Sequence, residues 1–92
     1  MDWDKDSIFK ALGDSTRRII LDELSDHNER TLYELTAQFV MKHNLAISRQ
    51  AIAKHLKTLE DAGLVISKRK GKHRVLTFNK EPLRSLLEEW LN

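Results

Sequence analysis

The strongest constraint on the fold is a stretch, residues 48–78, in which the hydrophobic pattern changes from helical to strand-like. In its first half Ile52, Leu56 and Leu59 recur at spacings of four and three residues, so they lie on one face of a helix. Ser48 precedes this face and carries a side chain that caps helices well. The side of the helix away from the apolar face is basic and polar, with Arg49, Gln50, Lys54 and Lys57.

A β-hairpin is expected directly after this helix. Gly63 is suited to ending the helix, because glycine readily adopts the backbone conformation that closes one. Residues 64–70 and 74–78 then favour two strands, and Gly71 with Lys72 supplies the turn between them. The tip of the hairpin is almost entirely cationic, since it reads Lys68, Arg69, Lys70, Gly71, Lys72, His73 and Arg74.

Apolar spacing predicts two helices near the N-terminus. They meet at Gly13, which can end the first helix just before Asp14 or Ser15 caps the second. Glu23 lies off the apolar stripe of the second helix, so we expect its carboxylate to face solvent. The apolar residues of the two helices are Ile8, Phe9 and Leu12, and Ile19, Ile20 and Leu24.

Two more helices are predicted. Thr31 and Glu34 are spaced as a capping box, which marks the start of a third helix with the apolar stripe Leu35, Phe39 and Val40. A last helix opens at Glu81 and Pro82, because proline fits the first helical turn. Its wide apolar face needs a partner surface and consists of Leu83, Leu86, Leu87, Trp90 and Leu91.

The chain is short, and nothing in it divides it. Its 92 residues, 40% of them hydrophobic, suffice for one core, so we expect a single domain, 1–92, that is mainly α with a small β-hairpin. No apolar run could cross a membrane and the N-terminus is acidic, so we expect a cytoplasmic protein without membrane contact. The absence of cysteine excludes disulfides and thiolate chemistry.

Charge is divided unevenly, although the net value is only +2. Residues 1–34 carry nine Asp/Glu and five Lys/Arg, a balance of −4, whereas residues 42–80 carry two and ten, a balance of +8. Such a block attracts polyanions, although ordinary solvated lysines and arginines would give the same count. A helix roughly 10 to 12 Å across fits the major groove, so the helix and the basic hairpin together favour duplex DNA as the partner.

The residue types suggest how contacts to DNA are divided. Gln50 can pair with adenine, Arg49 with guanine or a phosphate, and Ala51 can touch a thymine methyl group. His55 suits a structural role or a phosphate contact as well as a base contact. The hairpin cations can neutralise phosphates or enter the minor groove. The full candidate set is Ser48, Arg49, Gln50, Ala51, Lys54, His55, Lys57, Lys68, Arg69, Lys70, Lys72, His73 and Arg74.

Two segments resemble the ArsR-type winged helix-turn-helix repressors: ALGDSTRRIIL at residues 11–21 and SRQAIAKHLKTLEDAGLV at residues 48–65. The resemblance runs from Ile8 to Leu91 and implies a homodimer paired through the first and last helices. Two features depart from the family. Residues 40–47 are additional to the usual spacing before the recognition helix. These residues either lengthen the third helix or form a longer turn. Residues 31–38 lack cysteine and histidine, which excludes thiolate-based metal sensing.

The terminal helices carry the candidate dimer interface. Trp3 and Trp90 suit burial between subunits, with packing inside one chain as the alternative. The four histidines show no metal-ligand spacing, so we expect no metal and no cofactor, and no residue identifies a small-molecule effector. The candidate interface residues are Trp3, Ile8, Phe9, Leu83, Leu86, Leu87, Trp90 and Leu91.

These features favour a sequence-specific transcriptional regulator, a dimeric repressor with its recognition helix, Ser48–Ala62, in the major groove and its wing, Lys68–Arg74, on the backbone or in the minor groove. The alternative is a protein-interaction module on the same scaffold with only weak, nonspecific DNA binding. Single-strand or RNA binding is disfavoured, because Phe78 is the only aromatic residue between 42 and 80. No catalytic constellation can be assembled, so we do not expect an enzyme.

Overall fold

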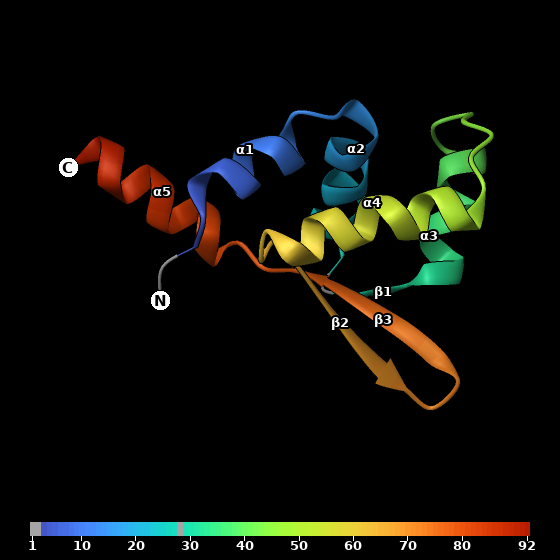
Figure 1. Cartoon of the computed structure of the whole chain (residues 1–92). Coiled ribbons are helices and arrows are strands. Elements are labelled where there is room, and N and C mark those ends of the chain that lie inside the picture. Colours follow the sequence, from blue (N-terminus) through green and yellow to red (C-terminus); the bar gives the residue numbers. More distant parts are fainter. Residues whose placement is uncertain (1–2, 28) are drawn as a thin grey trace.

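The computed structural model describes residues 3–27 and 29–92, which form five helices and a three-stranded antiparallel sheet (Figure 1). The helix α4 crosses the middle of the molecule, α1 and α5 lie together at one end, and the β2–β3 hairpin projects away from the helices (Figure 1). In chain order the elements are α1 Lys5–Leu12, α2 Ser15–Ser25, β1 Arg30–Thr31, α3 Leu32–Met41, α4 Arg49–Asp61, β2 Val65–Lys70, β3 His73–Phe78 and α5 Glu81–Leu91. The predicted fold class, a mainly α winged helix-turn-helix, is confirmed. Within the described part of the chain, no helix is long and apolar enough to span a membrane.

Three helices start at local hydrogen bonds that the sequence predicts. Asp14, and not Ser15, caps α2, because its carboxylate accepts the N–H of Arg17. The capping box at Thr31 and Glu34 is complete at α3. The Ser48 hydroxyl accepts the Ala51 N–H at 3.0 Å and so fixes the start of α4.

The end of α4 is a left-handed glycine closure. Gly63 has φ +79°, and its N–H donates to the Glu60 carbonyl while the Leu64 N–H donates to the Leu59 carbonyl. The chain then enters β2, which pairs with β3 in a register that sets Val65 opposite Phe78. The turn needs a second positive φ, +60°, which Gly71 provides.

The sheet has one strand that the sequence did not predict. β1 is only two residues long, with Arg30 opposite Leu76 and Thr31 opposite Val75 on the outer edge of β3. A segment this short has no hydrophobic period of its own, so only the exposed edge of β3 defines it as a strand.

The core lies where α4 meets the helices above it and the sheet below it. Ile52, Leu56 and Leu59 are completely buried, and Leu35 and Phe39 of α3 pack in the same core. The prediction that Val40 joins this stripe is wrong, since 56% of that residue is exposed. Val40 follows Phe39 directly, so helix geometry turns it about 100° away from the buried face.

Most of the additional residues before α4, residues 42–47, form a longer turn, because α3 ends at Met41 and α4 starts at Arg49. The first two additional residues, Val40 and Met41, belong to α3. The turn folds back on Glu23 of α2, whose Oε1 lies 3.0 Å from Lys42 Nζ and 2.9 Å from His43 Nε2. Arg30 reaches the other carboxylate oxygen at 3.4 Å. The expectation that Glu23 faces solvent is wrong, since only 1% of the residue is exposed.

Burial opposes the ionisation of Glu23, but its cationic neighbours outweigh that effect. The hydrogen bonds from His43 and Lys42, together with the charges of Lys42 and Arg30, hold the pKa of the Glu23 carboxyl below its usual value of 4.5. In return Glu23 raises the pKa of Lys42. The carboxylate therefore ties α2, β1 and the α3–α4 turn together by charge.

Candidate nucleic-acid interface

The N-terminal half of α4 presents three exposed polar side chains. Arg49, Gln50 and Lys54 make no ion pair or side-chain hydrogen bond within residues 3–27 and 29–92, and Ala51 beside them is half-buried. The opposite face of the helix is fixed by the fully buried Ile52 and by its neighbours in the core. The helix therefore offers unengaged donors from a rigid base, in the place where sequence reasoning expected base contacts.

The hairpin carries a second set of unengaged cations. Lys68, Arg69, Lys72 and His73 are exposed and form no ion pair among the residues that the structure describes. Lys70, predicted as a DNA contact with them, instead lies 3.0 and 3.2 Å from the two carboxylate oxygens of Glu29. Both partners of that pair are about half exposed, so Lys70 could exchange Glu29 for a phosphate at little cost.

Arg74 has a structural role that the sequence did not reveal. Its Nε donates to the Ser67 hydroxyl at 2.8 Å, and one terminal nitrogen donates to the Glu60 carboxylate at 3.1 and 3.2 Å. Ser67 belongs to β2 and Glu60 to α4, so one guanidinium joins the hairpin to the helix. Its donors are turned toward the protein, and Arg74 is therefore a poorer candidate for DNA contact than the sequence suggested.

His55 also turns inward, which favours the structural alternative among those the sequence left open. Its Nδ1 lies 3.3 Å from a terminal nitrogen of Arg17 and 3.9 Å from Asp14 Oδ1. Arg17 in turn donates to the carbonyls of Ala11 and Lys10 at the end of α1. The N–H of Arg17 is the largest cause of a lowered pKa at the Asp14 carboxyl. The cluster anchors α4 to the junction of α1 and α2.

Lys57 is the remaining cation of the predicted set on α4. It pairs with Asp61 one turn later at 2.8 Å, and that hydrogen bond raises the pKa of the Lys57 ammonium. Most of both side chains is exposed, so the pair is open to competition from a phosphate.

The structure adds α3 residues that sequence reasoning did not select. Tyr33, Thr36, Ala37 and Val40 line a shallow groove of about 390 Å³ with Arg49. Tyr33 is 70% exposed. Tyr33 is the second residue of α3, and this position was the available signal, because the N-terminus of a helix attracts anions such as phosphate.

The candidate interface residues at the other end of the molecule separate into two groups. Ile8 and Leu86 are 1% and 5% exposed and lie in the core of their own chain, so they have no surface to offer a partner. Leu83 packs partly against the same core. The exposed residues of the set are Phe9, Leu87, Trp90 and Leu91.

The two tryptophans have different surroundings. Trp90 stacks on Phe9 with ring centres 5.7 Å apart and is 61% exposed. Trp3 packs inside its own chain, where a Cβ added to Gly63 would lie 2.6 Å from the indole Cδ1. The packing of Trp3 follows the alternative of burial within one chain.

The described residues contain no group of three or more His, Cys, Asp or Glu side chains arranged to hold a metal ion. The clusters around Glu23 and His55 instead pair their carboxylates with cations or with a histidine. The exposed surface of α4 and the hairpin presents hydrogen-bond donors and positive charge.

Comparison with known proteins gives consistent matches. A family model described as a helix-turn-helix domain matches residues 12–67. The chain is 69% identical to the HTH-type transcriptional regulator YuzN of Bacillus subtilis over an alignment of 91 residues, and this alignment covers 99% of each chain. It is 33% identical to the transcriptional repressor SdpR of Bacillus subtilis, covering 94% of this chain and 88% of SdpR. The solved structure of an ArsR-like transcriptional regulator from Rhodococcus sp. RHA1 aligns with a TM-score of 0.73 and 33% identity over 91% of this chain and 73% of that one.

Proposed function

The chain belongs to the ArsR-type winged helix-turn-helix transcriptional regulators, and we propose that it is a homodimeric, sequence-specific repressor. Members of this family bind DNA and are not enzymes. In this proposal α4 lies in the major groove and the β2–β3 hairpin holds the DNA backbone. The observation that carries it is that the exposed polar face of α4 lies beside a hairpin on which Lys68, Arg69 and Lys72 form no ion pair with any described residue.

The exposed residues at the start of α4 would read base edges. Gln50 can form two hydrogen bonds with adenine, and Arg49 can do the same with guanine. Neither side chain must first break an ion pair with another described residue. Lys54, one turn further along α4, would neutralise a phosphate.

The hairpin would supply affinity rather than sequence preference. Lys68, Arg69 and Lys72 are exposed cations, and each phosphate contact of this kind releases counterions from the DNA. Lys57 and Lys70 can join them, because their exposed partners Asp61 and Glu29 compete weakly with a phosphate.

Dimerisation would use the exposed aromatic and leucine side chains of the terminal helices. Phe9 and Trp90 form one stacked pair, and Leu87 and Leu91 extend the apolar surface along α5. A surface of this kind on a small protein commonly marks an interface. Two-fold pairing would present two copies of α4 to half-sites of an inverted repeat, one helical turn apart. Repression is proposed from the likeness to SdpR, whose name describes a transcriptional repressor.

The test is fluorescence anisotropy with duplex DNA from the region upstream of its own gene and with a scrambled duplex, over a range of salt concentrations. A specific regulator should prefer the first duplex by about a thousandfold or more. Weak binding to both duplexes that vanishes together with rising salt would contradict the proposal and favour a protein-interaction module.

Two variants with a matched control locate the contacts. Lys72→Gln should lower the slope of affinity against salt by about one unit for both duplexes. Lys10→Gln, which changes another exposed lysine, on α1, should leave the slope unchanged. Gln50→Ala should relax the preference at one base pair at a cost of roughly 1 to 3 kcal/mol. An unchanged preference would remove Gln50 from the set of base-reading residues.

A further inference from the structure

The turn between α3 and α4, residues 42–47, is held at both of its ends. His43 at the start and Ile47 at the end are half-buried, whereas residues 44–46 between them are exposed. Ile47 packs against the core, and the His43 ring lies beside the ring of Phe39, with ring centres 5.9 Å apart. The turn lies at the end of the molecule away from α5 and leads directly into α4 (Figure 1).

The backbone of this turn is irregular. Asn44 has φ +52°, a left-handed conformation that is disfavoured for residues other than glycine. Two hydrogen bonds return the chain to α3, from the His43 N–H to the Gln38 carbonyl at 3.3 Å and from the Leu45 N–H to the Phe39 carbonyl at 2.8 Å. A disfavoured conformation of this kind persists only where the surrounding structure holds it in place. The turn therefore depends on the side chains that contact it.

The contacting side chain is Glu23 of α2. Its Oε1 lies 2.9 Å from His43 Nε2 and 3.0 Å from Lys42 Nζ, so one buried oxygen holds two consecutive residues of the turn. Arg30 lies 3.4 Å from the other oxygen. Well-packed apolar residues often match or exceed a buried charge cluster in stability. Hydrogen bonds are directional, however, so this cluster favours a single arrangement of the turn where apolar packing would tolerate several.

The other end of the turn leads into the part of α4 that would read DNA. Ile47 directly precedes Ser48, whose side chain caps the helix. Arg49 and Gln50, the proposed base-reading residues, come before Ile52, the first completely buried residue of α4. The core thus holds α4 most firmly from Ile52 onward, and the position of the two residues before it depends on the turn.

We propose that Glu23 and His43 are positioning residues for operator recognition, which hold the turn so that Arg49 and Gln50 meet base edges in one arrangement. This role rests on the proposed function, whereas the order of the turn rests on the contacts within the chain alone. The turn contains most of the residues that are additional to the usual spacing of the family. A longer connection has more conformations to lose, and the contacts to Glu23 would offset that loss.

Amide hydrogen exchange, measured by NMR on the full chain without DNA, tests the order of the turn. His43→Leu removes the donor to Glu23 but keeps an apolar side chain, so the Leu45 and Ile52 amides should exchange at least about tenfold faster. The Leu59 amide, in the buried part of α4, is the internal reference and should change less. His43→Gln keeps an N–H donor and should restore slow exchange. Unchanged exchange at Leu45 and Ile52, or equal acceleration at Leu59, would overturn the proposal.

Fluorescence anisotropy with the specific and the scrambled duplex tests the role in recognition. His43→Leu should weaken binding to the specific duplex by about tenfold, because an ordered contact surface becomes disordered. Binding to the scrambled duplex and the salt slope should stay unchanged, since no phosphate contact is lost. His43→Gln should bind the specific duplex as the wild type does. A merely structural role would weaken both duplexes alike, and that result would overturn the proposal.

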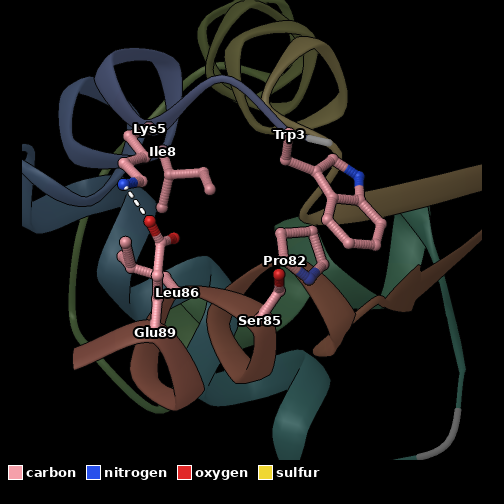
Figure 2. Close-up of a pocket in the computed structure, with 7 residues that line it drawn as sticks. All are labelled: Trp3, Lys5, Ile8, Pro82, Ser85, Leu86 and Glu89. Carbon is pink, nitrogen blue, oxygen red and sulfur yellow. Dashed lines mark hydrogen bonds and ion pairs between the residues drawn. The ribbon is translucent and has the colours of Figure 1, made fainter. Parts of the chain in front are cut away.

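A second lysine of similar exposure supplies the matched control. The side chains of Lys42 and Lys5 are 51% and 49% exposed, and Lys5 pairs with Glu89 at 2.6 Å between α1 and α5, far from the turn (Figure 2). Lys42→Gln should lower the ratio of specific to nonspecific affinity, whereas Lys5→Gln should leave that ratio unchanged. An equal change in both variants would assign the effect to general charge and overturn the proposal.

The two measurements separate this proposal from the proposed function. Specific binding that His43→Leu does not weaken would reject the positioning role and leave the proposed function standing. A wild-type protein that prefers neither duplex would reject the proposed function and the positioning role with it, while faster exchange in His43→Leu would still establish that Glu23 orders the turn.

Discussion

Replacing Glu23 by glutamine should destabilise the fold more than any exposed charge substitution. The carboxylate is 1% exposed and is the shared partner of Arg30, Lys42 and His43. Arg30 depends on it most, because only 11% of that side chain is exposed and its Nε has no hydrogen-bond partner among the described residues. The substitution would therefore leave a nearly buried guanidinium without its counter-ion.

The cost follows from the geometry of the cluster. Removing one partner of a buried ion pair typically costs about 3 to 5 kcal/mol. The glutamine oxygen can still accept a hydrogen bond from Lys42 or His43, and Lys42 is half exposed, so the lower end applies, about 3 kcal/mol. Against a total stability of roughly 5 to 14 kcal/mol for a chain of this length, this is a large fraction. The melting temperature should fall by roughly 12 to 24 °C.

The assay is urea and thermal unfolding followed by circular dichroism at equal protein concentration, with Glu29→Gln as the control. Glu29 pairs with Lys70 at the surface, so its substitution should cost less than about 1 kcal/mol. A double-mutant cycle of Glu23→Gln with Arg30→Gln should show a coupling of at least about 1 kcal/mol. A loss at Glu23 no greater than that at Glu29, or additive substitutions, would refute the assignment of this cluster as an electrostatic anchor.

Three further outcomes are expected. Because the fold lowers the pKa of Glu23 from 4.5, the ionised carboxylate stabilises the protein fully above that pH, and this stabilisation is lost as the pH falls below it. The difference in unfolding free energy between the wild type and Glu23→Gln should therefore shrink in acid, and a constant difference would contradict this. Gly63→Ala should lower the free energy of unfolding by about 2 to 3 kcal/mol, because the residue has φ +79° and its new Cβ would collide with the Trp3 indole, whereas Gly71→Ala, with open space around it, should lower it by about 1 kcal/mol. Chemical denaturation compares the two variants, and equal losses would argue against the indole contact. Leu87→Asp should raise the dimer Kd at least about tenfold in sedimentation equilibrium, while Ile66→Asp, similarly exposed on the hairpin, should leave it unaltered; a dimer indifferent to Leu87 would exclude this face.

Local signals explain why most of the fold could be predicted. The Ser48 cap, the Thr31 capping box and the closure at Gly63 each act through hydrogen bonds between residues at most five positions apart, so the sequence around them contains the whole interaction. The strand β1 could not be found in this way, because its two residues are defined by the edge of β3, more than 40 positions later.

The candidate DNA face was predictable in outline but not residue by residue. The positions of Arg49 and Lys68 on exposed faces follow from helical and strand periods. The partners of His55 and Arg74 come from elements that only the tertiary fold brings close, and Glu23 was misplaced for the same reason. A titratable side chain off an apolar stripe reads as solvated unless its distant counter-ions are known.

The bridge from Arg74 to Ser67 and Glu60 has a consequence for how the protein would meet its operator. It joins the hairpin to α4 in the folded protein, so the two candidate contact elements are held in one relative orientation before they would meet DNA. The conformational entropy of aligning them is then lost before the encounter and does not weaken binding. A conformational change in the hairpin or in α4 would therefore affect the other element, because neither can rotate without breaking a hydrogen bond of the Arg74 guanidinium.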